Sequence, residues 1–301
     1  MKTKLGVFTG AVACLLFLAG GVGFCGDETK VNLKDWTAII ESKVAEPIGD
    51  KGIVNYEDQY IEVLAIASPP ERYFGKPQAR PLCLRAAKVV AMRDMIEMIE
   101  GVRVDSETVV KDYVVASDTI QATVNGIARN VTPVGEPNYM PDGTCEVRYR
   151  MSLRGPFMNT ILPRVIADDR KTGTPPPPMK ARPAPQGNDI FTGLVVDARG
   201  LGARPAMSPK IFDENGGEVY GSLVVSKEYA IRQGISGYAR DLTTAQANPR
   251  VTTNPLTIKA LSAEGAGKSD IRIRNEDAQR LRAVRENLSF MQKCRVMIVL
   301  D

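Results

Sequence analysis

A glycine-rich stretch near the end of the chain contains residue types that bind phosphate. The run LSAEGAGKSD ends with the GKS of a P-loop, in which the lysine, here Lys268, contacts the terminal phosphates. A P-loop also needs a glycine where this chain has Ser262, and a helix directly after the loop. Residues 256–261 and 270–274 instead alternate polar and apolar side chains, as strands do. The sequence therefore predicts a β-hairpin tip, and no nucleotide is expected to bind.

Two further polar loops in the second half of the chain carry candidate binding side chains. The loop Arg199–Arg204 is basic, and the loop Asp213–Glu218 holds carboxylates that could ligate calcium. The carboxylate spacing differs from that of an EF-hand, and Asn-Gly between apolar runs predicts a hairpin. Asp197 with Asp213 or Glu218 would supply the two carboxylates of a hydrolase that needs no histidine. A small-ligand, ion or glycan site and a hydrolase thus stay open as alternatives.

The composition argues against most enzyme classes. The chain has no histidine, which excludes Ser-His-Asp and Cys-His catalysis, histidine-ligated zinc and the usual proton shuttle at neutral pH. Its 39 basic and 35 acidic residues give a net charge of +4, too small to indicate a nucleic-acid partner. We therefore predict no catalytic, cofactor-binding or metal-ligating residue, no cofactor and no enzymatic activity.

The N-terminal segment indicates export. Residues 1–24 begin with Lys2 and Lys4, continue as an apolar run and end in small residues, which is typical of a bacterial signal peptide. The run is also just long enough for a membrane anchor. Cys25 raises the alternative of lipidation, although Val22 and Phe24 do not match a lipobox. The predicted location is the periplasm or the outer membrane.

Three cysteines lie well inside the exported chain: Cys83, Cys145 and Cys294. They are far apart, and no CxxC spacing suggests a metal or redox site. An oxidising compartment allows one disulfide among them, and the sequence does not choose which pair forms it.

A proline-rich stretch divides the exported chain into two predicted domains. Residues 166–188 contain four consecutive prolines and others among polar residues, which favours an extended linker. Residues 31–165 and 189–301, on either side, show periodic patterns. The predicted fold class is α+β for both domains, the first with two helices packed on one face of a sheet.

The patterns also place individual elements. In the first domain they predict helices at 31–43, 82–100 and 118–130 and strands at 60–67, 102–110, 130–134 and 145–153. In the second they predict a strand at 190–198, a hairpin at 210–221, a helix at 228–239, a helix after Asn275 and a buried strand at 294–300. Asp118 and Asn275 are the expected helix caps. The apolar stripe of the long helix is expected to be Leu84, Val89, Met92, Met95, Ile96 and Ile99.

Residues 60–153 resemble a known bacterial family. The similar segments are VLAIA, LRAAKVVAMRDMIEMIEGVRV, DTIQATVNGIARNV and PDGTCEVRYRMSL. They are similar to the LPP-twenty lipoprotein family, which is related to the N-terminal domain of the flagellar assembly protein FlgT. The resemblance implies a secreted or outer-membrane protein, with association to the flagellar basal body in some members, and it implies no catalytic residues. Residues 189–301 resemble segments of uncharacterised secreted bacterial proteins.

The sequence therefore favours a non-enzymatic envelope protein that works as an assembly or interaction module. The expected partners are further copies of the chain, or envelope or flagellar proteins, with peripheral membrane association allowed.

Overall fold

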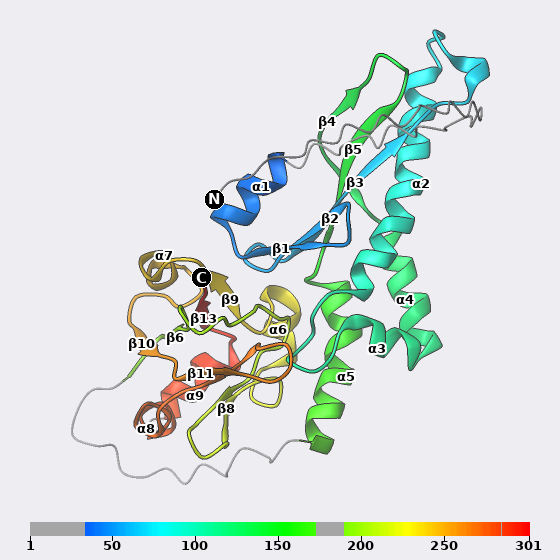
Figure 1. Ribbon diagram of the computed structural model, residues 1–301. Coiled ribbons are helices and arrows are strands. Elements are labelled where there is room, and N and C mark those ends of the chain that lie inside the picture. Colours follow the sequence, from blue (N-terminus) through cyan, green and yellow to red (C-terminus); the bar gives the residue numbers. More distant parts are fainter. Residues whose placement is uncertain (1–33, 173–189, 284) are drawn as a thin grey trace, which may run out of the picture. The chain divides into compact units, whose positions relative to one another are not determined.

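The computed structural model describes residues 34–172, 190–283 and 285–301, and its mixed α+β architecture confirms the predicted fold class (Figure 1). Residues 33–301 form one compact unit. We refer to residues 34–172 as the N-terminal lobe and to residues 190–301 as the C-terminal lobe. The predicted signal peptide and most of the predicted linker lie outside the described residues. None of the described helices is both long and apolar enough to cross a membrane.

The N-terminal lobe is built on an antiparallel sheet in the order β1-β2-β3-β5-β4. The strands are β1 Ala45–Ile48, β2 Gly52–Asn55, β3 Tyr60–Ala67, β4 Thr132–Tyr139 and β5 Cys145–Ser152. β3 and β5 pair along their whole length, with Tyr60 opposite Ser152 and Ala67 opposite Cys145. Side chains alternate between the two faces, so the apolar residues of β5 face the core and Arg148 and Arg150 lie on the other face.

Helices cover both faces of this sheet. They are α1 Lys34–Ser42, the 3₁₀ helix η1 Glu71–Tyr73, α2 Ala79–Glu100, α3 Val110–Val115, α4 Asp118–Ala128 and α5 Pro156–Thr172. α2 packs on β3 and β5 and contacts α3 and α4 (Figure 1). On the opposite face, Trp36 of α1 donates a hydrogen bond of 2.9 Å to the buried carboxylate of Glu62. The three predicted helices of this lobe are thus confirmed.

The buried face of α2 differs from the predicted stripe. It consists of Cys83, Ala87, Ala91, Met95, Met98 and Ile99. Val89, which we expected in the core, is 58% exposed. Alanines at four-residue spacing let the helix lie close to the sheet, whereas a search for large apolar side chains selects a neighbouring face.

One element and two boundaries in this lobe differ from the prediction. Residues 102–110 form a turn with one bridge, Arg103 to Val109, because the Asp105 side chain accepts the backbone N–H groups of Glu107 and Thr108. Ser117, not Asp118, caps α4. α5 continues to Thr172, seven residues beyond the predicted end of the first domain.

The C-terminal lobe contains two four-stranded sheets. A parallel sheet has the order β10-β6-β13-β9, and a mixed sheet has the order β11-β12-β7-β8. The strands are β6 Gly193–Asp197, β7 Ile211–Phe212, β8 Glu218–Tyr220, β9 Gly237–Ala239, β10 Pro255–Lys259, β11 Ser262–Glu264, β12 Asp270–Arg272 and β13 Val296–Val299. The helices are α6 Lys227–Gln233, α7 Leu242–Ala247, α8 Asn275–Ala283 and α9 Arg285–Gln292. β13 is fully buried between β6 and β9, which confirms the predicted buried strand.

Three expectations for this lobe need correction. Most of the run 256–261 does not pair with 270–274, because β10 joins β6 in the parallel sheet and β11 forms the other arm of the hairpin. Of this run only Leu261 donates a backbone hydrogen bond, of 2.8 Å, to Arg272. The predicted helix 228–239 ends at Gln233, where Gly234 takes φ +80°, and the chain continues into β9. Asn275 is the first residue of α8 and not its cap.

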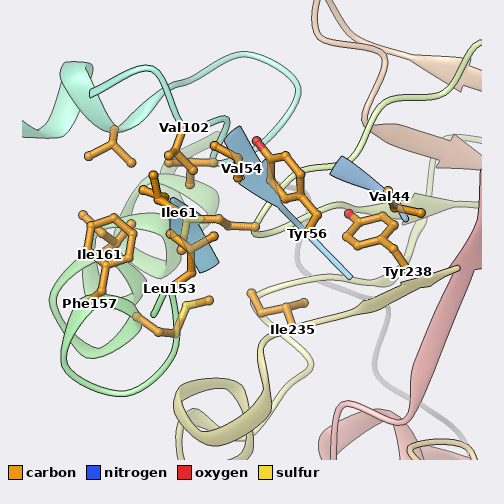
Figure 2. Packing of buried hydrophobic residues seen from close by; sticks show 14 of the residues in the cluster. Val44, Val54, Tyr56, Ile61, Val102, Leu153, Phe157, Ile161, Ile235 and Tyr238 are labelled. Carbon is orange, nitrogen blue, oxygen red and sulfur yellow. The ribbon is translucent and has the colours of Figure 1, made fainter. Parts of the chain in front are cut away.

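One continuous hydrophobic core runs through both lobes. Figure 2 shows apolar side chains of the N-terminal lobe meeting Ile235 and Tyr238 of the C-terminal lobe. The rings of Tyr56 and Tyr238 pack edge to face, with centroids 6.3 Å apart. The structure also pairs Cys83 with Cys145 in a disulfide and leaves Cys294 as a buried thiol.

Candidate functional site

The glycine-rich loop is the tip of a β-hairpin, as the sequence predicts. β11 and β12 pair antiparallel, with Glu264 opposite Asp270. Two residues of the tip lie in the left-handed region, Gly265 at φ +76° and Lys268 at φ +53°. The strand β12 follows the tip, so no helix N-terminus stands where a P-loop would hold its phosphate.

The backbone N–H groups of this tip bind the N-terminal lobe. Gly267 N–H donates to the carbonyl oxygen of Ser106 at 2.6 Å, and Ala266 N–H donates to the Glu107 carboxylate at 3.1 Å. The Ser106 hydroxyl in turn donates to Asp270 at 2.5 Å. These amides already have protein acceptors, whereas a P-loop aims its amides at phosphate oxygens. The loop therefore joins the two lobes.

Asp197, the first of the predicted carboxylates, is paired within its own turn. Arg199 donates two hydrogen bonds of 2.8 Å to it, one to each carboxylate oxygen. These bonds hold the pKa of Asp197 below its usual range. A carboxylate so stabilised in its ionised form is a poor proton carrier at neutral pH.

The rest of the basic loop contacts the N-terminal lobe. Arg204 donates to Glu46 at 3.1 Å, and Arg103 approaches the same carboxylate at 3.2 Å. Arg103 also donates to the carbonyl oxygen of Pro205 at 2.5 Å. Arg204 thus connects the loop Arg199–Arg204 to the N-terminal lobe, and both arginines of the loop have carboxylate partners within the protein.

Asp213 closes the β7–β8 hairpin. Its carboxylate accepts the backbone N–H groups of Asn215 and Gly217 at 3.0 and 2.7 Å, and Arg282 contacts it at 2.7 Å. Burial opposes ionisation, but the bonds from Arg282 and Gly217 outweigh it, and the pKa of Asp213 lies below its usual range. This carboxylate therefore holds the turn of the predicted hairpin and connects it to α8 through Arg282.

Glu218 belongs to a buried charge cluster that the sequence did not reveal. The cluster consists of Asp169 of α5, Lys210 just before β7, Glu218 of β8 and Asp270 of β12. Lys210 Nζ lies 2.5 Å from an Asp169 oxygen, and its backbone N–H donates to Asp270 at 3.1 Å. The hydroxyl of Ser222 donates to the second Asp169 oxygen. The side chain of Glu218 lies against Gly221, whose added Cβ would be 2.5 Å from one carboxylate oxygen.

Three carboxyl groups in this cluster share a single ammonium group. Burial raises the pKa of Glu218 to about 7, and the negative charge of Asp169 acts in the same direction. Burial also raises the pKa of Asp270. One oxygen of Glu218 has no hydrogen-bond partner among the described residues. The pKa of Glu218 thus lies close to neutral pH, and the Asp169 and Glu218 side chains are each only 4% exposed.

Sequence reasoning missed Asp169 because residues 166–188 were assigned to the linker. The spacing of Phe157, Ile161, Leu162 and Val165, all fully or almost fully buried, has the period of a helix and would have revealed α5. The burial of Asp169 itself follows from its contact with Lys210 in the other lobe, which no local pattern encodes.

The predicted carboxylates do not combine into one site. Asp197 pairs with Arg199, Asp213 with Arg282, and Glu218 with the cluster around Lys210. Within residues 34–172, 190–283 and 285–301, no three histidine, cysteine, aspartate or glutamate side chains are placed to hold a metal ion.

Comparison with known proteins gives a match for the C-terminal lobe. Residues 193–301 match the family model of the second domain of Treponema pallidum Tp0624. The matched range begins at the first residue of β6 and includes both sheets of that lobe. No curated protein matches the chain. The resemblance of residues 60–153 to the LPP-twenty family stays a prediction.

Proposed function

We propose that this chain is a non-enzymatic envelope protein that serves as an assembly or interaction module in the periplasm or at the outer membrane. The observation that carries the proposal is the use of its candidate chemical groups in contacts within the protein. Arg199, Asp213 and Asp270 hold turns, a helix and the two lobes in place. Because these charged side chains are bonded within the protein, we expect other molecules to bind its outer surface and not an internal site.

The proposed cellular context comes from the sequence. The signal-peptide pattern of residues 1–24 supports export, and the resemblance of residues 60–153 supports an outer-membrane or flagellar setting. The disulfide between Cys83 and Cys145 agrees with an oxidising compartment. The match of residues 193–301 to a domain described as the second of its protein supports a modular arrangement.

A small-ligand module is the second candidate, because the N-terminal lobe has a cleft of about 280 Å³ between α1 and the β1–β2 hairpin. The lining includes Trp36, Ile40, Pro47, Ile53 and one carboxylate, Asp50. A mostly apolar cleft with one charge would suit a small amphiphilic cation. Such a ligand would raise the unfolding temperature of the wild-type protein but not of Asp50→Ala.

Cross-linking in the native host tests the leading proposal. Cells are cross-linked, separated into cytoplasmic and envelope fractions, and the fractions are resolved by size under native conditions. We expect the protein in the envelope fraction, in a complex much larger than the 32.8 kDa chain. A monomer in the cytoplasmic fraction would refute both the location and the assembly role.

A further inference from the structure

One end of the N-terminal sheet carries a cluster of positive charge. β3 ends at Ala67 where β5 begins at Cys145, and the segment 68–78 leads from there into α2. The disulfide Cys83–Cys145 joins the first turns of α2 to β5 at this end. The ring of Phe74 lies beside the turn before β5, 3.9 Å from the position that a Cβ on Gly143 would occupy. The segment thus contacts the turn before β5 through Phe74, and the helix that follows it is joined to β5 by the disulfide.

The segment that leads into α2 and the first half of that helix are rich in positive charge, although the turn before β5 also carries the exposed carboxylate of Asp142. Residues 69–93 contain six basic residues and one acidic residue, Glu71, in a chain whose overall charges nearly balance. We define the basic tip as the exposed cations of residues 72–88, which are Arg72, Lys76, Arg80, Arg85 and Lys88. The first turn of α2 contains no acidic residue, although the positive end of the helix dipole would favour one. The positive charge of the tip therefore comes both from its side chains and from the N-terminal end of the α2 helix dipole.

Among the described residues, no carboxylate forms an ion pair with these cations. Aromatic rings hold three of them instead. Arg72 and Lys76 lie 4.9 and 5.9 Å from the ring centroid of Tyr73, and Arg80 lies 4.8 Å from that of Tyr139. A ring orients a cation without cancelling its charge, so the tip stays available to an external anion.

The tip also exposes apolar surface. Phe74 is 48% exposed between Arg72 and Lys76, and Val89 is 58% exposed on the solvent face of α2, four residues after Arg85. Cations beside exposed apolar side chains fit a bilayer surface, where the charges meet phosphate headgroups and the ring enters the interface. An acidic protein partner would pair with the cations but would not require an exposed phenylalanine between them.

We propose that the basic tip docks on a membrane surface rich in anionic phospholipids, with Phe74 entering the headgroup region. This inference rests on the proposed envelope function and specifies one partner for it. The attraction is electrostatic, so it weakens as salt is added. Docking of this kind is peripheral and leaves the rest of the protein surface free for other partners.

Vesicle binding tests the proposal. The protein, with the N-terminus it carries in its host, is sedimented with vesicles of phosphatidylcholine alone or mixed with phosphatidylglycerol. The difference between the two vesicle types measures charge-dependent binding and removes any contribution of an apolar N-terminal segment. We expect binding to the mixed vesicles, and a loss of at least about tenfold in affinity for the triple variant Arg72→Glu, Lys76→Glu, Arg80→Glu.

A matched variant separates the tip from net charge. Lys111→Glu, Lys227→Glu and Lys259→Glu together make the same change in charge at exposed sites elsewhere, and this variant should keep most of its affinity. Phe74→Ala should weaken binding while leaving its salt dependence in place. Circular dichroism confirms that each variant is folded.

Two results would overturn the inference. One is equal binding of the wild-type protein to both vesicle types or to neither, and the other is equal loss of binding in the tip and control variants. If the protein still enters a large envelope complex in cross-linked cells, the interaction module survives and only its lipid partner is wrong. If the protein neither binds the anionic vesicles nor enters a large envelope complex, both proposals fail.

Discussion

The backbone N–H of Gly267 donates a hydrogen bond to the carbonyl oxygen of Ser106, 2.6 Å away and in the other lobe. Gly267 precedes the lysine of the apparent phosphate-binding motif, and its amide is the kind of group that a P-loop would turn toward an anion. Here the amide is one of several contacts that hold the hairpin tip on the turn containing Ser106. The glycines of the motif are needed because this contact is close.

Gly265→Ala should therefore destabilise the protein more than an alanine at a comparable free turn. An added Cβ at Gly265 would lie 2.2 Å from the Ser106 hydroxyl oxygen and would displace the bond from that hydroxyl to Asp270. Gly216 is the matched control, since its φ of +80° is similar and no atom lies within 4 Å of its added Cβ. In urea denaturation we expect Gly265→Ala to cost about 1–3 kcal/mol more than Gly216→Ala. Equal costs would mean that the tip does not pack on the N-terminal lobe.

The raised pKa of Glu218 predicts an inverted pH dependence of stability. The folded protein holds this proton more tightly than the unfolded chain, whose glutamate has a pKa near 4.5. The stability that protonation supplies is complete below about pH 4.5 and is lost as the pH rises to about 7. For a shift of this size the loss is roughly 3 kcal/mol.

The variant Glu218→Gln should remove this dependence, because the amide keeps the shape of the protonated acid. We expect it to match the wild-type free energy of unfolding at pH 5 and to exceed it at pH 8. Glu136→Gln, at an exposed position on β4, is the control and should follow the wild-type curve. A wild-type curve without a decrease between pH 5 and pH 8 would show that Glu218 is not buried beside Asp169.

Removing the disulfide should lower the stability of the N-terminal lobe. Cys83 and Cys145 close a loop with a sequence separation of 62 residues, for which chain entropy predicts about 4 kcal/mol of stabilisation. The double variant Cys83→Ala, Cys145→Ala should unfold at lower urea, and reduction of the wild-type protein should have a similar effect. A reductant should not affect the double variant further. An unchanged wild-type midpoint after reduction would show that the bond is absent from the native protein.

The sequence predicted correctly those helices and strands in which the pattern of apolar residues matches the pattern of buried residues. β3 was placed with its observed ends, since a short apolar run stopped by Pro69-Pro70 defines it. The buried β13 was recognised because a central parallel strand is apolar on both faces. The stripe of α2 was misplaced, because its closest contacts use alanines, which a search for large apolar residues ignores.

Contacts between the lobes lie beyond such patterns. The hairpin at Lys268 was predicted correctly, yet nothing in its sequence shows that its amides meet Ser106 and Glu107, about 160 residues earlier. The same holds for Asp169 and Lys210, whose ion pair needs both lobes in place. The sequence shows which charged and polar residues are present, but it does not show which residues of the other lobe they bind.

Calorimetric titration with ATP and magnesium tests the central claim most directly, namely that the residues resembling a chemical site are structural. The wild-type protein and Lys268→Ala are titrated side by side, and the stability of each is measured first. Lys268 is exposed, so its replacement should change the free energy of unfolding by no more than about 0.5 kcal/mol. The account predicts no heat of binding and no hydrolysis for either protein. Micromolar binding by the wild-type protein that is lost in Lys268→Ala would contradict it.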